Sequence, residues 1–261
     1  MRTLLPRILL IVSLLAGARA ADFATTMMDA TFKFYHSDST STCFLVKRGE
    51  EDPALYLITT AHTVERTKGE TAVLVLREKK DDGSYARHDH TITIRKGEEP
   101  LWVRHAKEDV AVMRLADPMP VKVAALPERM LAEEAALKAE DVHLCSRLFV
   151  LTYPQRFEAN GAGMPVARQG IFASPPLLPW KTHPTFLADF TTFAGDSGGP
   201  VFIESKEGHP AVAGIVINQH HHEEKVNGEY EERLIRYPLG MGTVLRSDYL
   251  RETLAKAAES K

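Results

Sequence analysis

The sequence predicts an all-β protein. Short apolar or alternating runs recur along the chain, and charged or Gly- and Pro-rich turns such as 80–83 separate them. Helical segments do not alternate with these runs as βαβ units would require. A chain of 261 residues with 44% hydrophobic residues can bury a substantial core, so we expect one or two domains built as β-barrels.

The first half contains six candidate strands before a Pro-containing connection begins at Pro118. These strands are expected at 31–35, 43–46, 55–60, 72–76, 91–94 and 110–115. Beyond the connection, residues 128–138 combine strong helix formers with spaced apolar residues, which predicts a short helix between the two halves.

Strand signals resume in the second half, interrupted by loops rich in Gly and Pro at 154–165 and 174–184. We expect strands at 144–151, 185–190, 200–203, 211–217 and 242–245. Ser247 is placed to cap a final helix over 248–258.

The most informative motif is Gly195-Asp196-Ser197-Gly198-Gly199-Pro200. It exposes a serine hydroxyl among glycines whose backbone can approach a ligand closely. The N–H groups of Gly195 and Ser197 can both point at a substrate carbonyl oxygen, as an oxyanion hole requires. The motif therefore predicts Ser197 as a nucleophile for acyl transfer, rather than an ordinary serine in a loop.

A base and a group to orient it precede this serine. His62 follows the run 55–58, and Asp109 opens the run 110–115. The order His, Asp, Ser is that of chymotrypsin-type enzymes, distinct from the subtilisin and α/β-hydrolase orders. The alternatives are a surface histidine and a turn aspartate; Glu108 is a poorer match because it precedes the motif position.

These motifs resemble the trypsin/chymotrypsin superfamily of serine peptidases, and most closely its bacterial branch of HtrA and glutamyl-endopeptidase-like enzymes. Four further segments carry the resemblance, which covers roughly residues 30 to 250. They are Phe149 to Pro154, Arg168 to Ile171, Leu187 to Phe190 and Ala213 to Val216. A PDZ-sized segment does not follow residue 250, so the regulatory module of HtrA enzymes is not expected.

The resemblance implies a chymotrypsin-like fold of two six-stranded antiparallel Greek-key barrels, with a short inter-barrel helix and a C-terminal helix. Residues 21–127 would form the N-terminal barrel that carries His62 and Asp109. Residues 128–261 would contain the inter-barrel helix, the barrel that carries Ser197, and the terminal helix.

The resemblance also assigns a substrate pocket, with departures from the family pattern. The base of the pocket is Thr191, where trypsin-type enzymes place an aspartate, so a basic P1 residue is not expected. Thr192 matches a threonine of glutamyl endopeptidases, but their histidine aligns near Val216 and is missing. Ile217-Asn218-Gln219 replaces the usual Ser-Trp-Gly that binds substrate backbone.

In zymogens of this superfamily, a new N-terminus pairs with the aspartate before the serine, here Asp196. No Ile-Val-Gly-Gly-like start follows the N-terminal segment, so we expect no such switch. The loop around Ser197 would then be ordered constitutively, by substrate or by a partner.

Residues 1–20 have the pattern of a secretory signal peptide, with Arg2 and Arg7, a short apolar run and Ala18-Arg19-Ala20. The alternative is an uncleaved N-terminal anchor. We expect export to a periplasm or beyond and no stable membrane insertion after cleavage, because no other run is long enough to span a bilayer. A net charge of −3 gives no sign of a nucleic-acid partner.

Two features leave alternatives open. Cys43 and Cys145 either pair or remain free thiols. His220-His221-His222 is either a metal or pH-sensing element or a solvated hairpin loop. We favour the loop, because adjacent residues of an extended strand point to opposite faces.

The sequence as a whole predicts an exported serine endopeptidase that acts on polypeptides through an acyl-enzyme, without a metal or other cofactor. The second hypothesis is a catalytically latent homologue that binds peptides or proteins, motivated by the altered segment 217–219. Oligomeric state and natural substrate are left open by the sequence.

Overall fold

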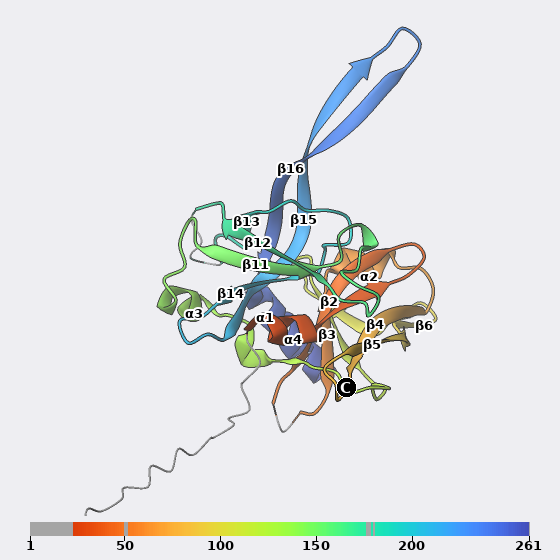
Figure 1. The fold of residues 1–261 in the computed structure, drawn as a ribbon, viewed down its shortest axis with the longest axis vertical. Helices are drawn as coiled ribbons and strands as arrows, with labels where there is room; N and C mark the ends of the chain where they lie inside the picture. Colours follow the sequence, from red (N-terminus) through yellow and green to blue (C-terminus); the bar gives the residue numbers. More distant parts are fainter. Residues whose placement is uncertain (1–22, 50–51, 176–178, 180, 261) are drawn as a thin grey trace, which may run out of the picture.

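The computed structural model describes residues 23–49, 52–175, 179 and 181–260. These residues form two β structures side by side, with helices at the seam and a long two-stranded projection (Figure 1). The prediction of an all-β, chymotrypsin-like fold is confirmed. The predicted signal peptide, 1–20, lies outside the described residues, and no described helix has the length and apolarity needed to cross a bilayer.

In the described residues the N-terminal half contains an eight-stranded sheet, not the six strands expected, and β6 and β7 form a separate two-stranded sheet. The path of the eight-stranded sheet is β5-β4-β1-β2-β3-β9-β8, and β10 adds to β2 in parallel. The elements of this half are α1 (Phe23–Ala30), β1 (Thr31–Tyr35), β2 (Thr40–Lys47), β3 (Leu55–Thr59), α2 (Ala61–Arg66), β4 (Thr71–Lys79), β5 (Tyr85–Thr93), β6 (Arg95–Lys96), β7 (Glu99–Pro100), β8 (Trp102–Arg104), β9 (Ala111–Leu115) and β10 (Leu126–Pro127).

The C-terminal half is a closed six-stranded barrel in the order β11-β12-β13-β16-β15-β14, as expected. Closure leaves no free edge within the barrel itself. Its elements are β11 (Arg147–Thr152), η2 (Pro154–Arg156), β12 (Val166–Phe172), β13 (Thr185–Asp189), β14 (Pro200–Glu204), β15 (Pro210–Asn227), β16 (Glu232–Arg246) and the terminal helix α4 (Ser247–Glu259).

One apolar cluster joins the two halves. It combines side chains of β2, β3 and β9 with side chains of β14, β15 and β16, and α1 and α4 contribute to it as well. Each half has a further cluster of its own. Because burial of apolar surface is the main favourable term in folding, the shared cluster fixes the two halves against each other.

Arg77 adds a polar link across the same seam. Its guanidinium is buried and donates to Tyr153 Oη at 3.0 Å and to the carbonyl of Gly163 at 3.1 Å, both in the C-terminal half. It also donates to the carbonyls of Met28 at 2.8 Å and Thr31 at 2.6 Å. One cation therefore hydrogen-bonds to acceptors from α1, β1 and the opposite half, and such bonds offset the cost of burying polar groups.

The prediction of a single helix over 128–138 is wrong. The chain forms a short 3-10 turn, η1 (Glu128–Met130), and then a separate helix, α3 (Glu134–Ala139). Between them Leu131 makes a β-bridge to Val212, and the N–H of Ala132 donates to the carbonyl of Val212 at 2.9 Å. Both side chains are buried, so docking against β15 outweighs local helix propensity.

The predicted helix cap is also wrong. Ser247 is the first residue of α4, and its side chain makes no capping bond. Its hydroxyl instead donates to the carbonyl of Ala132, which ties the terminal helix to the segment between the halves.

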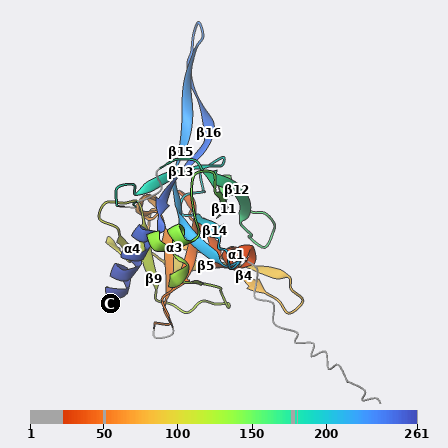
Figure 2. The same cartoon turned by 90° about the vertical axis from the view of Figure 1, so that its left-hand side faces the viewer.

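The strands expected at 211–217 and 242–245 are much longer than their apolar cores. β15 and β16 continue as a hairpin that leaves the barrel and projects into solvent (Figures 1 and 2). We call residues 220–240 the arm. His220, His221 and His222 lie within β15, so the expectation that they form a loop is wrong. Nowhere in the described chain do three or more His, Cys, Asp or Glu side chains gather as a metal site.

The two cysteines are free thiols. Cys43 is buried on β2, where burial raises the pKa of its thiol, whereas Cys145 is exposed in the other half. The first of the two alternatives, a disulfide between them, is not formed.

We predict that Arg77→Met lowers the free energy of unfolding by about 3 kcal/mol or more. Methionine retains apolar bulk but removes four hydrogen bonds from a charged donor, three of them in buried surroundings, and each such bond contributes about 1.5–3 kcal/mol. Urea unfolding measures the difference. The control is Arg233→Met in the exposed arm, for which we expect a change within about 0.5 kcal/mol. Equal effects of the two substitutions would contradict the role of Arg77.

Candidate active site

Two glycines give the loop around Ser197 its shape. Gly195 and Gly198 have φ of 100° and 82°, a region that other residues rarely adopt. A Cβ on Gly195 would lie 2.2 Å from the carbonyl oxygen of Tyr153, and one on Gly198 would lie 2.1 Å from that of Thr42. The motif therefore needs glycine for backbone angle and for close packing at both positions.

The loop also orients its amides. The N–H of Gln155 donates to the carbonyl of Ala194 at 2.6 Å. Because the two ends of a trans peptide point in opposite directions, this bond turns the N–H of Gly195 away from Gln155. Within the described chain, the N–H groups of Gly195 and Ser197 donate to no protein acceptor. Both amides are thus available to an external oxygen.

Thr42, on β2, holds this loop from the opposite half. Its hydroxyl donates to the carbonyl of Gly195 at 2.9 Å and accepts from the N–H of Tyr153 at 3.1 Å. Its N–H donates to the carbonyl of Ser197 at 2.9 Å, and its own carbonyl accepts from Thr59 Oγ1 at 2.9 Å. Thr42 is fully buried, so these bonds are shielded from water.

His62 and Asp109 meet through two contacts. His62 lies in the first turn of α2, directly after β3, and Asp109 precedes β9, the neighbour of β3 in the sheet. The backbone N–H of His62 donates to Asp109 Oδ1 at 2.9 Å, and Nδ1 lies 2.6 Å from Oδ2. An Nδ1 proton shared with a carboxylate leaves Nε2 free to accept a proton.

The pKa of Asp109 lies below its ordinary value. Burial alone would raise this pKa, but the hydrogen bonds and the charge of His62 outweigh burial and stabilise the carboxylate. An ionised carboxylate in this position favours a protonated imidazole when one forms.

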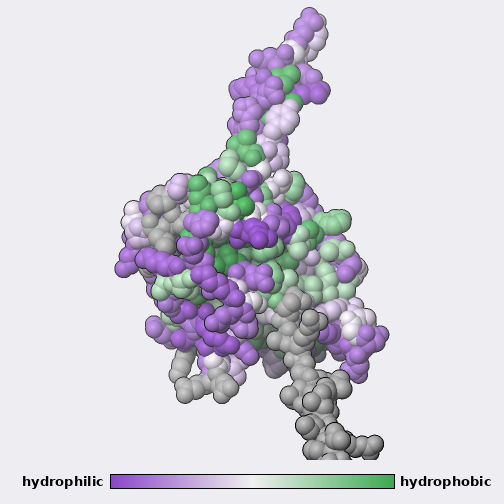
Figure 3. Space-filling model, turned by 60° about the vertical axis from the view of Figure 1, so that its left-hand side comes forward, coloured by the Kyte–Doolittle hydropathy of each residue, from purple (hydrophilic) through white to green (hydrophobic). Residues whose placement is uncertain are grey.

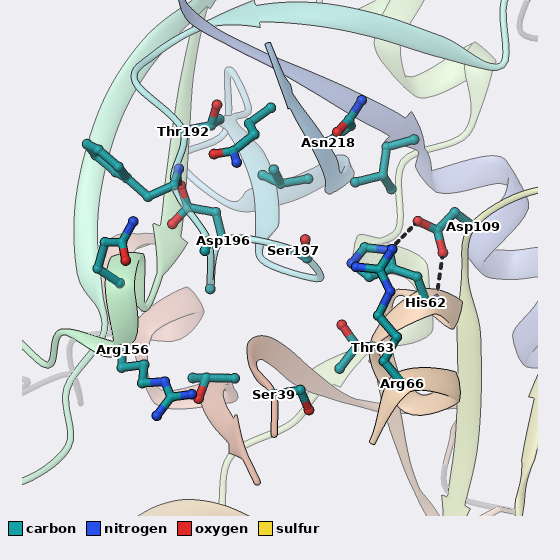
Figure 4. Close-up of a pocket in the computed structure, with 18 of the residues that line it drawn as sticks. Ser39, His62, Thr63, Arg66, Asp109, Arg156, Thr192, Asp196, Ser197 and Asn218 are labelled. Atoms are coloured by element: carbon teal, nitrogen blue, oxygen red, sulfur yellow. Dashed lines mark hydrogen bonds and ion pairs between the residues drawn. The ribbon is translucent and has the colours of Figure 1, made fainter. Parts of the chain in front are cut away.

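His62, Asp109 and Ser197 line one cleft of about 750 Å³ (Figure 4). His62 and Ser197 come from opposite halves of the molecule and face the same space. Their side chains make no direct hydrogen bond in the described structure, and His62 Nε2 lies 3.5 Å from Thr60 Oγ1. Such bonds are often long in unliganded enzymes and tighten in the complex with substrate.

Asp196 is buried beside the serine and has a cationic partner. Arg168, on β12, places Nη2 at 2.7 Å from Asp196 Oδ1, an ion pair without hydrogen-bond alignment. Asp196 Oδ2 accepts from the N–H of Phe193 at 2.8 Å. The guanidinium also donates to Thr152 Oγ1 and lies over the ring of Phe190 at 5.3 Å. The side chain of a neighbouring strand thus neutralises Asp196.

The structure brings most of the predicted pocket residues together. Thr192, Val216, Ile217, Asn218 and Gln219 line the same cleft as Ser197. Thr191 does not line it: its side chain is exposed, and its carbonyl accepts from Arg168.

Sequence reasoning missed several residues that line the cleft. They are Asp38, Ser39, Thr40, Thr63, Arg66, Gln155, Arg156, Phe193 and Ala194. Four of these neighbour predicted site residues, namely Thr63, Arg66, Phe193 and Ala194, so proximity in sequence could have identified them. The others come from β2, its preceding turn and η2, and only the fold brings them to the cleft.

Comparison with known proteins identifies the family. A sequence model of the trypsin-like peptidase domain matches residues 41–215. The chain belongs to the trypsin-like peptidase family. A search of curated proteins finds none that matches it.

Among solved structures, the peptidase is similar to Rv3671c of Mycobacterium tuberculosis, determined as a serine-to-alanine variant in its inactive form. The TM-score is 0.50 and the identity 16%, and the match covers 92% of this chain and 91% of the other. At this identity the likeness shows a shared fold.

We predict that Arg168→Met destabilises the peptidase by about 3–5 kcal/mol, because it leaves the buried carboxylate of Asp196 without its cation. The double variant Arg168→Met with Asp196→Asn should recover part of this loss. Unfolding in urea of both single variants and the double variant gives the coupling energy. Additive losses would mean that the two side chains do not stabilise each other.

Proposed function

We propose that this protein is a serine endopeptidase in which Ser197 is the nucleophile, His62 the general base and Asp109 the residue that orients it. The observation that carries the proposal is that His62 and Asp109, joined by two hydrogen bonds, line the same cleft as Ser197. Membership of the trypsin-like peptidase family supports a polypeptide substrate.

In the proposed reaction Ser197 Oγ attacks the scissile carbonyl carbon, and His62 Nε2 takes the hydroxyl proton. The peptide C–N bond breaks as the imidazolium returns that proton to the leaving amine, which leaves an acyl-enzyme. Water then attacks the ester with the same base, releasing the acid and regenerating Ser197. Asp109 keeps the imidazole in the productive tautomer and stabilises its cationic form.

The amides of Gly195 and Ser197 would bind the oxyanion of each tetrahedral intermediate. Their lack of acceptors in the described structure and the packing of the loop against Thr42 support this role. Donors fixed before reaction stabilise developing charge without the cost of reorganisation.

We further propose that the loop is ordered without a zymogen cleavage. In the resembled enzymes a new N-terminal ammonium pairs with the aspartate before the serine. Here the guanidinium of Arg168 already occupies that role beside Asp196, and it belongs to the folded barrel. Of the three alternatives, constitutive order is therefore the one that these contacts favour.

The cleft favours a P1 residue that is not basic. Asp109 and Asp196, which line it, are paired with His62 and Arg168, and the third lining carboxylate, Asp38, lies 3.6 Å from His36 Nδ1. The side chains of Thr192 and 216–219 are uncharged. Arg66 and Arg156 add positive charge to the walls of the cleft and would repel a basic side chain.

The N-terminal pattern over 1–20 leads us to propose an exported protein, secreted or periplasmic. Protein sequencing of the native N-terminus would test this, since cleavage after Ala20 is expected.

A catalytically latent, peptide-binding homologue is the second candidate. The absence of a direct bond between His62 and Ser197 in the described structure is the observation that favours it. The experiment below separates the two functions.

We predict that the mature protein reacts with a fluorophosphonate probe at Ser197. Ser197→Ala should abolish labelling and lower peptide turnover by about 10³-fold or more. Asp109→Asn should lower turnover by a similar factor while the fold, checked by circular dichroism, is retained. A folded wild-type protein that neither labels nor cleaves would favour the latent homologue.

We also predict that a library of peptides varied at P1 is cleaved mainly after uncharged residues. Arg66→Gln combined with Arg156→Gln should raise the rate after Lys or Arg by about threefold to tenfold, because it removes two repulsive charges. Mass spectrometry of the products measures the profile. A wild-type profile dominated by Lys and Arg would contradict the predicted pocket.

A further inference from the structure

The arm is a direct continuation of the cleft wall. β15 contributes Val216 to Gln219 to the cleft and then runs on without a loop to Asn227. β16 returns from Glu232 and re-enters the barrel at Met241, where β13 pairs with it. A chain that leaves the cleft along β15 therefore meets the arm next.

Pairing register divides the arm into two faces, because directly opposed residues share a face and successive residues alternate. One face carries the pairs His222 with Tyr237, Glu224 with Ile235, and Val226 with Arg233. The other face carries the pairs His221 with Pro238, Glu223 with Arg236, Lys225 with Leu234, and Asn227 with Glu232.

The second face is stabilised by its own charges. Glu223 pairs with Arg236 at 2.9 Å and lies 3.4 Å from His221, and Lys225 pairs with Glu232 at 3.1 Å. The first face has three apolar side chains among polar ones: Val226 and Tyr237 are 43% and 46% exposed, and Ile235 lies between them in the alternation. The second face also exposes one large apolar side chain, Leu234 at 49%, which lies among the ion pairs. Figure 3 shows apolar residues at the base of the arm and midway along it.

The outer edge of β15 is unpaired along the arm. Strand β14 and the two glycines before it bond to β15 as far as Val216. Beyond that point, β16 is the only strand in the described chain that pairs with β15. A two-stranded ribbon is only marginally stable in water, and a third strand would satisfy its free N–H and C=O groups. Extended polypeptides bind other proteins in this way, through main-chain bonds and side-chain pockets on alternate residues.

We propose that the arm is a docking strand for polypeptide substrates: an extended segment outside the cleft adds to the outer edge of β15, and its apolar side chains cover the face of Val226, Ile235 and Tyr237. This proposal rests on the proposed peptidase function. Its occupant is an unfolded, extended polypeptide, because the edge that would bind it continues the strand that lines the cleft.

The geometry makes the effect depend on substrate length. From Gln219 to Val226 a strand rises by roughly 3.3 Å per residue, so an extension of about seven residues is needed to reach Val226. A bound strand leaves the cleft in one direction along β15, so extension of only one end of the substrate should help. Cleavage of short peptides that fill only the cleft should not depend on the arm.

The test compares one cleavable short peptide with two versions, extended by about eight alternating apolar and polar residues at the N-terminal or C-terminal end. With the wild type, one of the two extended peptides should have a KM about tenfold lower than that of the short peptide, with little change in kcat. Replacement of residues 221–238 by Asn-Gly should remove that gain and leave cleavage of the short peptide unchanged.

Point variants provide a matched pair in case the deletion disturbs the barrel. Ile235→Ser on the apolar face should reduce the gain from extension about threefold or more, whereas Leu234→Ser, the adjacent residue on the charged face, should not. Circular dichroism checks that both variants are folded.

Direct binding separates this proposal from the proposed function. In the Ser197→Ala background, fluorescence anisotropy should show tighter binding of one extended peptide, and Ile235→Ser should weaken that binding selectively. Failure of the wild type to cleave any peptide would count against the peptidase and leave this binding result decisive for the arm. Equal binding of short and extended peptides would overturn the docking proposal. A second result would also overturn it: deletion of the arm changes the mass measured by sedimentation, while the preference for the extended peptide remains. The arm would then join copies of the chain.

Discussion

Thr42 is the residue on which the arrangement of the site depends. The loop around Ser197 belongs to the C-terminal barrel, and His62 with Asp109 belongs to the N-terminal sheet, so their relative position depends on the seam between them. Thr42 lies at that seam and bonds to the backbone at Gly195, Ser197 and Tyr153. Because three of its four bonds cross to the other half, a shift of one half against the other would break the contacts that hold the loop carrying both candidate oxyanion donors.

Two buried polar contacts made by guanidinium groups complete this arrangement: one compensates a buried charge, and the other forms hydrogen bonds to backbone carbonyls. Arg168 compensates the charge of Asp196 beneath the serine, and Arg77 satisfies carbonyls from both halves. Both use the multiple donors and permanent charge that distinguish arginine from lysine. The site therefore rests on side chains that are in place once the chain has folded, which accords with constitutive order of the loop.

The sequence predicted what is encoded locally. The glycines around Ser197, and His62 and Asp109 beside their strands, belong to short motifs in which chemistry restricts residue type. Thr42 and Arg168 could not be found in this way, because their partners lie far away in sequence and neither residue type is distinctive. The arm was missed for a different reason. Prediction of a strand relies on alternating apolar residues, which arise when one face of the strand is buried. Beyond Ile217 the two strands pair with each other in solvent, so Gln219 to Lys225 shows no apolar alternation.

The bond between Thr42 and Gly195 joins residues 153 positions apart, which has a consequence for the order of folding. Closing so long a loop costs chain entropy that only docking of the two halves can offset. Contacts of this kind form late, after local hairpins and the separate sheets. A chain emerging from the ribosome can build its N-terminal sheet early, but the loop around Ser197 acquires its shape only when the last barrel strands close. Assembly of the site is thereby delayed until β16 has been synthesised.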